Sequence, residues 1–266
     1  AAEMPAGFEP AALEAQAMAA RTYIVRRLLR DDRSNVPVKA ADVTDTVAHQ
    51  AYKSKAQMNR LRADDPEAWS RIDGAVRATA GQVIVYDDEP IEALYFAASN
   101  GYTENSEDVF PDKLPYLRSV ASPWDAEAAP DWETTTELSV EELYAKLGIR
   151  PTAAAIGHAS LRPAIRVVER TEGGRGKTLK IGSKSMSGAD ARAKLGLRSA
   201  AFEWTIAGDR IAITAYGNGH GVGMSQWGAQ GMAREGRTAE EIIRYYYEGA
   251  DVMEASKLAA ARTNRA

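Results

Sequence analysis

FEPAALEAQAMAARTYIVRRLLR, residues 8–30, decides the fold of this chain, because it predicts one long helix on which other elements can pack. Pro10 stands near the start, where a helix tolerates proline, and strong helix formers follow it. Apolar residues recur every three or four positions and so share one face. The many alanines make this a helix that packs closely against its neighbours.

Further helices and a hairpin are predicted outward from this segment. A helical period returns in residues 53–79, with a break at 64–66, and we expect closing helices at 224–235 and 239–247. A β-hairpin is predicted over residues 83–98, with strands at 83–86 and 91–98. Helices beside a hairpin indicate an α+β fold.

The middle of the chain is rich in predicted strands. We expect strands at 165–170 and 178–181, and a hairpin formed by 201–206 and 210–215. Ser139 and Glu142 match a capping box at the start of a short helix. The acidic, proline-containing stretch 125–131 has the composition of a linker.

These elements predict a helical and hairpin core that carries a second, strand-rich subdomain, with a cleft between them. The catalytic core is expected to comprise residues 1–130 and 212–253, the subdomain residues 131–211, and a tail residues 254–266.

The composition excludes several classes of function. The 266 residues include 33 Lys and Arg against 37 Asp and Glu, a net charge of −4 with both signs interspersed, which argues against nucleic-acid binding. With no cysteine, and with His49, His158 and His220 far apart, neither a metal site nor a cofactor is expected. There is no apolar run of about 18 residues, and the chain starts at Ala1, so we expect that a preceding segment has been removed.

Three segments could carry chemistry. The loop of residues 99–107 packs hydroxyls, amides and carboxylates beyond an apolar strand, as a sugar site or as a plain solvated turn. The glycine-rich stretch 217–231 brings the backbone close to a ligand or to another segment, and it lacks a nucleotide-binding fingerprint. Glu3 precedes Met4 and Pro5, where a carboxylate is ordinarily just an exposed chain end.

Six collinear stretches together resemble the stage II sporulation protein D family. The match covers nearly the whole chain and is therefore far more specific than any single motif. The stretches are Glu3 to Pro5, EAQAMAARTYIVRRL (Glu14 to Leu28), VTDTVAHQAY (Val43 to Tyr52), ASNGYTENSEDVF (Ala98 to Phe110), PYLRSVASPWD (Pro115 to Asp125) and GNGHGVGMSQWGAQGMA (Gly217 to Ala233).

The resemblance implies a lytic transglycosylase that cleaves peptidoglycan between N-acetylmuramic acid and N-acetylglucosamine during engulfment. Glu3 falls on the family's catalytic glutamate, acting as both acid and base to form 1,6-anhydro ends. Four positions fall on functional residues of the family, and five more are expected in the cleft. They are Glu3, Arg21, Thr103 and Tyr116, followed by Gln16, Asn105, His220, Ser225 and Gln226. We expect these residues to converge on one groove.

The resemblance also implies an extracytoplasmic protein, anchored to the membrane by an N-terminal helix absent from this chain. Its partners would be glycan strands, a membrane-bound amidase and scaffold proteins of engulfment. Some members bind zinc near the stretch that holds His49 here, but this chain has Gln50 beside it and no cysteine, so that site is expected to be lost.

Two other functions stay open. One is a hydrolase with a second carboxylate, for which Glu104, Glu107 and Asp108 are the candidates. The other is a non-catalytic wall-binding module that activates a partner amidase.

Overall fold

The computed structural model describes residues 2–38, 41–46, 49–149, 165–182 and 184–258. The chain forms two compact units, one of Ala1–Tyr95 with Ala229–Ala266 and the other of Phe96–Gly228. It passes from one unit to the other within β3 (Tyr95–Phe96) and back within α8 (Gln226–Arg234). Both crossings therefore lie inside regular elements rather than in loops.

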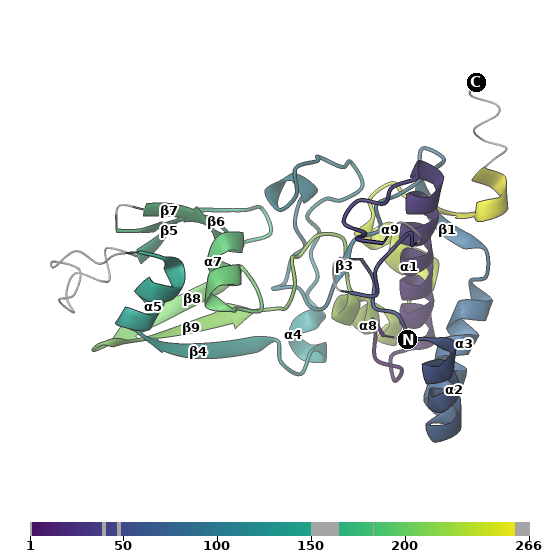
Figure 1. Ribbon diagram of the computed structural model, residues 1–266, viewed down its shortest axis with the longest axis horizontal. Coiled ribbons are helices and arrows are strands. Elements are labelled where there is room, and N and C mark those ends of the chain that lie inside the picture. The colour runs from purple at the N-terminus through teal and green to yellow at the C-terminus, as the bar shows by residue number, and fades with distance from the viewer. Residues whose placement is uncertain (1, 39–40, 47–48, 150–164, 183, 259–266) are drawn as a thin grey trace. The chain divides into compact units, whose positions relative to one another are not determined.

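The first unit is built around α1 (Pro10–Arg30), which confirms the predicted long helix. It packs against α3, α9 and β1 (Figure 1), and its small residues Ala12, Ala15 and Ala19 are fully buried there. The break predicted near residue 65 separates two helices, and α9 confirms a predicted closing helix. The other elements of this unit are α2 (Lys55–Asp64), α3 (Pro66–Ala78), β1 (Gln82–Tyr86), β2 (Glu89–Pro90), α9 (Ala239–Tyr246), β11 (Asp251–Glu254) and the 3-10 helix Ala255–Lys257.

The predicted hairpin of residues 83–98 is wrong in its second strand. After the turn at Asp87 and Asp88, which both have positive φ, β2 pairs with β1 over two residues. The main partner of β1 is β11, in the register Val83 opposite Met253. Pro90 has no backbone N–H to donate, which favours an early end to β2.

The predicted tail is wrong where the structure describes it. Glu254 pairs with Gln82 at the end of β11, and Leu258 is buried against Val83 and Val85. Residues 259–266 of that prediction lie outside the described residues. The segment 251–258 thus extends the sheet of the first unit and contributes Leu258 to its core.

The second unit contains two three-stranded antiparallel sheets, β4-β9-β8 and β5-β6-β7. Figure 1 shows α5 and α7 beside these sheets, and one hydrophobic core takes side chains from all of them. Both predicted strand pairs and the Ser139–Glu142 capping box are confirmed. The elements are η1 (Ser106–Asp108), α4 (Asp125–Ala128), β4 (Glu133–Ser139), α5 (Val140–Leu147), β5 (Ile165–Arg170), β6 (Gly176–Ile181), β7 (Lys184–Ser187), α7 (Gly188–Leu195), β8 (Phe202–Ala207), β9 (Arg210–Tyr216) and β10 (Met224–Ser225).

The mixture of helices and several small sheets confirms the predicted α+β class. The compact units divide the chain at other positions than the predicted subdomains, since residues 96–130 and 212–228 pack with the strand-rich region. The division into a catalytic core and a subdomain, and the cleft between them, stay predictions. Among the described helices, none has the length and apolar character needed to cross a membrane.

Candidate active site

The Glu3 carboxylate is held by two donors of the first unit. Its Oε1 accepts the backbone N–H of Ala51 at 2.6 Å, and the Tyr95 hydroxyl donates to the same carboxylate. The pKa of Tyr95 is raised, first by burial and then by the negative charge of Glu3, so the tyrosine stays protonated as a donor. Glu3 itself is partly exposed. A carboxyl group oriented in this way can reach a ligand while its direction is fixed.

The loop that carries Glu3 is fastened at several points before α1 begins. Met4 and Phe8 are buried, and the Arg71 guanidinium donates to the carbonyl oxygens of Ala6 and Phe8 at 3.0 and 2.6 Å. The backbone N–H of Glu9 donates to a side-chain oxygen of Gln230 at 2.7 Å. These contacts give the loop around Glu3 a defined place, and they give Arg71 a positioning role that the sequence did not indicate.

Arg21 binds the protein's own backbone. Its guanidinium donates to Gln82 O at 2.8 Å and to Thr79 Oγ1 at 3.2 Å, which ties α1 to the end of α3 and the start of β1. Gln16, on the same helix, is 6% exposed. The predicted contacts of both residues with substrate stay predictions, and for Arg21 the structure adds a structural role.

The polar loop of the second unit is also internally bonded. Thr103 is fully buried, and its hydroxyl donates to Arg118 O at 3.1 Å while accepting Val120 N–H at 2.9 Å. The Asn105 amide nitrogen donates to the Glu172 carboxylate at 2.8 Å, and its amide oxygen accepts the backbone N–H of Ser119 at 3.0 Å. Tyr116 is 6% exposed. The loop is therefore a rigid scaffold rather than a solvated turn.

Asp125 is a buried centre of hydrogen bonds, so the prediction of a linker at residues 125–131 is wrong at its first residue. Its carboxylate accepts the backbone N–H and the hydroxyl of Ser99 at 2.8 and 2.9 Å, and the Ser122 hydroxyl at 2.6 Å. It also accepts the hydroxyl of Ser225. Burial raises the pKa of Asp125, whereas these hydrogen bonds lower it. Three segments distant in sequence are joined at this one residue.

Replacement of Ser225 by Ala is expected to lower the free energy of unfolding by about 1 to 2 kcal/mol, since one hydrogen bond to a buried carboxyl group is lost. Urea titration measures this change, with Ser185→Ala on the exposed part of β7 as the matched control. The predicted cleavage of glycan strands, measured per folded molecule, should persist if Ser225 only stabilises the fold. An inactive variant of unchanged stability would instead return Ser225 to substrate binding.

His220 and Gln226 lie in the glycine-rich segment of the second unit. The His220 Nδ1 accepts the backbone N–H of Val222 at 3.1 Å, and its ring lies 5.7 Å from the Phe96 ring and 5.4 Å from the Phe110 ring. Gln226 is 8% exposed. Their predicted contact with sugar, like the convergence of all nine residues on one groove, stays a prediction.

The three candidates for a second catalytic carboxylate are engaged in ion pairs. Glu104 is buried against Arg175 at 3.0 Å, and Asp108 lies 3.4 Å from the Lys177 ammonium. Hydrogen bonds from Arg118 lower the pKa of Glu107 to about 2. Glu107 is therefore a poor nucleophile or base, because Arg118 already stabilises its charge, and Glu104 is too deeply buried to reach a substrate.

His49, which lies in the stretch where some family members bind zinc, makes hydrogen bonds with nearby residues. The His49 Nδ1 accepts Thr44 N–H at 3.1 Å, and its Nε2 lies 3.2 Å from Ser34 O. Within the described part of the chain, no three His, Asp or Glu side chains are grouped as a metal site would need. His158 lies outside the described residues.

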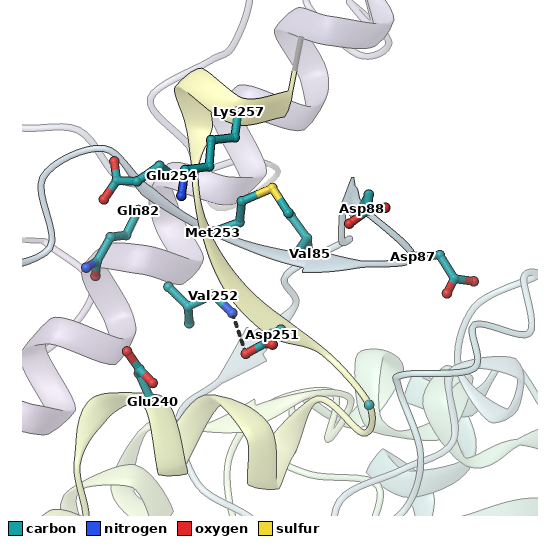
Figure 2. Close-up of a pocket in the computed structure, with 11 residues that line it drawn as sticks. Gln82, Val85, Asp87, Asp88, Glu240, Asp251, Val252, Met253, Glu254 and Lys257 are labelled. Atoms are coloured by element: carbon teal, nitrogen blue, oxygen red, sulfur yellow. Dashed lines mark hydrogen bonds between the residues drawn. The ribbon is translucent and has the colours of Figure 1, made fainter. Parts of the chain in front are cut away.

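A pocket of about 540 Å³ opens in the first unit beside β1, β11 and α9 (Figure 2). It contains none of the predicted site residues. Carboxylates of Asp87, Asp88, Glu240, Asp251 and Glu254 line it, and Figure 2 shows them spread along the pocket rather than gathered at one point. Two of these are already paired, since Arg244 contacts both Glu240 and Asp251.

The chain is similar to one protein family and to several individual proteins. A family model described as "Stage II sporulation protein" matches residues 1–86, the part that holds Glu3 and Arg21. Stage II sporulation protein D of Bacillus subtilis (strain 168) is 43% identical over 257 residues, which cover 96% of this chain and 72% of that protein. This chain belongs to the stage II sporulation protein D family.

A second member of the stage II sporulation protein D family, from Bacillus amyloliquefaciens, is 44% identical over 257 residues, with 96% of this chain and 72% of that protein covered. A more distant relative is the Amidase enhancer of Bacillus subtilis (strain 168), 26% identical over 295 residues, which cover 93% of this chain and 38% of that protein. The resemblance to the family is thus confirmed, and the chain is a sporulation protein.

Proposed function

We propose that this chain is a lytic transglycosylase that cleaves the glycan strands of peptidoglycan, with Glu3 as its single catalytic acid and base. The proposal is carried by the arrangement at Glu3, where a partly exposed carboxyl group is oriented by Ala51 N–H and the Tyr95 hydroxyl. Membership in the stage II sporulation protein D family supports it, as does the position of Glu3 within the matched residues 1–86.

The reaction needs one group that gives a proton and then takes one back. The Glu3 carboxylic acid protonates the glycosidic oxygen as the bond to C1 of N-acetylmuramic acid breaks, and an oxocarbenium-like centre develops. The resulting carboxylate takes the proton from the 6-hydroxyl of the same sugar, whose oxygen bonds to C1. The product is a 1,6-anhydro end, and Glu3 has regained its proton without a water molecule being consumed.

The burial of Glu104 and the ion pairs of Glu107 and Asp108 argue against a two-carboxylate hydrolase. An inverting or retaining hydrolase needs a second carboxylate about 5 to 9 Å from the first, free to activate water or attack the sugar. We therefore favour the anhydro product.

The second candidate function is activation of a partner amidase, which the likeness to the Amidase enhancer favours. For either function we propose action outside the cytoplasmic membrane during engulfment, on glycan strands and alongside a membrane-bound amidase and scaffold proteins.

Mass spectrometry of the products from purified sacculi separates the three functions. A lytic transglycosylase acting alone releases fragments with 1,6-anhydromuramic ends. A hydrolase releases reducing ends, 18 mass units heavier by the one water added. An activator releases nothing by itself and increases peptide release only when an amidase is present. Either of the last two results would overturn the proposed activity.

A further inference from the structure

A second pocket, of about 240 Å³, lies wholly within the second unit and contains none of the nine predicted site residues. Its size is below the roughly 300–1,000 Å³ of ordinary small-molecule sites, so it suits one ring of a longer ligand. Its lining combines three aromatic side chains with an amide, a cation and a carboxylate. They are Trp132, Tyr216, Phe202, Asn100, Arg170 and Glu203.

The aromatic part of this pocket is held rigidly. The rings of Trp132 and Tyr216 lie 5.3 Å apart between centroids, tilted by 49°, and both side chains are half-buried. The Trp132 Nε1 donates to Ser99 O at 2.8 Å, and Trp132 O accepts Gly217 N–H at 2.7 Å. Since the Ser99 hydroxyl donates to the buried Asp125 carboxylate, the indole is anchored to a buried hydrogen-bond network.

The polar part offers groups that suit sugar hydroxyls. The Arg170 Nη1 donates to Gly174 O at 2.9 Å, which orients a guanidinium that has five N–H donors in all. Arg170 and Glu203 are exposed, so the rim presents a charged donor and a charged acceptor. The Asn100 amide donates to Gly173 O at 2.9 Å and thereby fixes the turn beside Gly174.

We propose that this pocket is a saccharide subsite that binds one ring of a glycan strand. A sugar ring has an apolar face, which a half-buried aromatic surface can cover, and a rim of hydroxyls, which can both donate and accept. Arg170 and Glu203 meet those two requirements through charge-assisted hydrogen bonds. A purely aliphatic ligand would offer neither Arg170 nor Glu203 a hydrogen-bond partner, and a phosphate would be repelled by the Glu203 carboxylate. The subsite deepens the proposed function, on which the identity of the strand rests.

The test uses the full chain with Glu3→Gln, so that no substrate is consumed, and chitotetraose as a soluble probe. The chain has five tryptophans, and Trp132→Phe assigns the indole N–H signal of Trp132 in a nitrogen-15 correlation spectrum. That signal should shift and saturate as chitotetraose is added. Arg170→Ala and Tyr216→Ala should each raise the Kd about tenfold, the equivalent of one lost hydrogen bond or one lost apolar face. Arg166→Ala, exposed on the same strand β5, is the matched control and should leave the Kd unchanged.

Each outcome decides the proposal. If the chain melts at the wild-type Tm and its Trp132 indole signal does not move, the subsite is overturned. A rise in Kd for Arg166→Ala as large as that for Arg170→Ala would overturn it as well. A shift caused by a stem tetrapeptide and not by chitotetraose would make the pocket a peptide site and also overturn it. Failure of the proposed function is recognised separately, because the wild-type chain would then yield no anhydro ends while sugar binding at Trp132 could persist.

Discussion

Glu3→Gln is expected to lower the release of 1,6-anhydro-muropeptides by at least about a hundredfold, the lower end of what a general acid and base contributes. Glutamine has nearly the same shape and cannot give up or take the proton. Its amide oxygen can still accept Ala51 N–H, as the Glu3 Oε1 does at 2.6 Å, and can still accept the Tyr95 hydroxyl. The Tm should therefore stay close to that of the wild type.

Glu9→Gln is the matched control for this variant. Glu9 precedes α1 by one residue, and its side chain makes no capping hydrogen bond to the helix. It should retain full activity, since its role is carried by the backbone N–H that donates to Gln230. Substantial cleavage by Glu3→Gln would move the acid to another residue, and an inactive Glu9→Gln would mean that the loop tolerates no change.

The sequence predicted the helices well because their signals are local. The three- to four-residue period of α1 and the capping box at Ser139 depend only on neighbouring residues. The hairpin after β1 was wrong for the opposite reason, since the strand that pairs with β1 lies near the end of the chain. Periodicity shows that a segment is a strand but does not show its partner.

The candidate site was predictable only in part. Composition indicated that the glycine-rich segment makes a close approach, and Gly221 confirms it: its φ is +92°, and a Cβ there would clash with the Arg175 guanidinium. Asp125 was missed because an acidic, proline-containing stretch has the composition of a linker. Its role depends on donors such as Ser225, 100 residues further along the chain, which no local pattern can indicate. Tyr95 was likewise hidden within an apolar run.

Arg175, which lies against Gly221, is the residue whose replacement should lower the free energy of unfolding most. Glu104 and Arg175 form an ion pair at 3.0 Å, with side chains 0% and 3% exposed. Glu104 also accepts the Thr171 hydroxyl at 2.9 Å, and Arg175 donates to Tyr102 O at 3.2 Å. Arg175→Met should lower the free energy of unfolding by about 3 to 5 kcal/mol, since it leaves a buried carboxylate without its cation. Against a typical total of about 5 to 15 kcal/mol, this change is large.

The loss caused by Arg175→Met should depend on pH in a defined direction. Burial raises the pKa of Glu104, and the charge of Arg175 opposes that rise. Without Arg175 the folded-state pKa of Glu104 rises further above its unfolded value. A group shifted in this way contributes stability below its unfolded pKa and loses that contribution as the pH rises through its folded pKa. The variant's deficit should therefore be smaller at pH 5 than at pH 8, as measured by urea titration.

Two further variants make this measurement decisive. Glu104→Gln combined with Arg175→Met removes both charges and should recover much of the lost stability, because a neutral pair avoids the cost of a buried, unmatched ion. Arg210→Met breaks the exposed pair with Glu137 on the same unit and should change the free energy of unfolding by no more than about 1 kcal/mol. If Arg175→Met were as mild as Arg210→Met, or equally destabilised at both pH values, the pair would not be a buried charge site, and the close approach at Gly221 would have to be explained by packing alone.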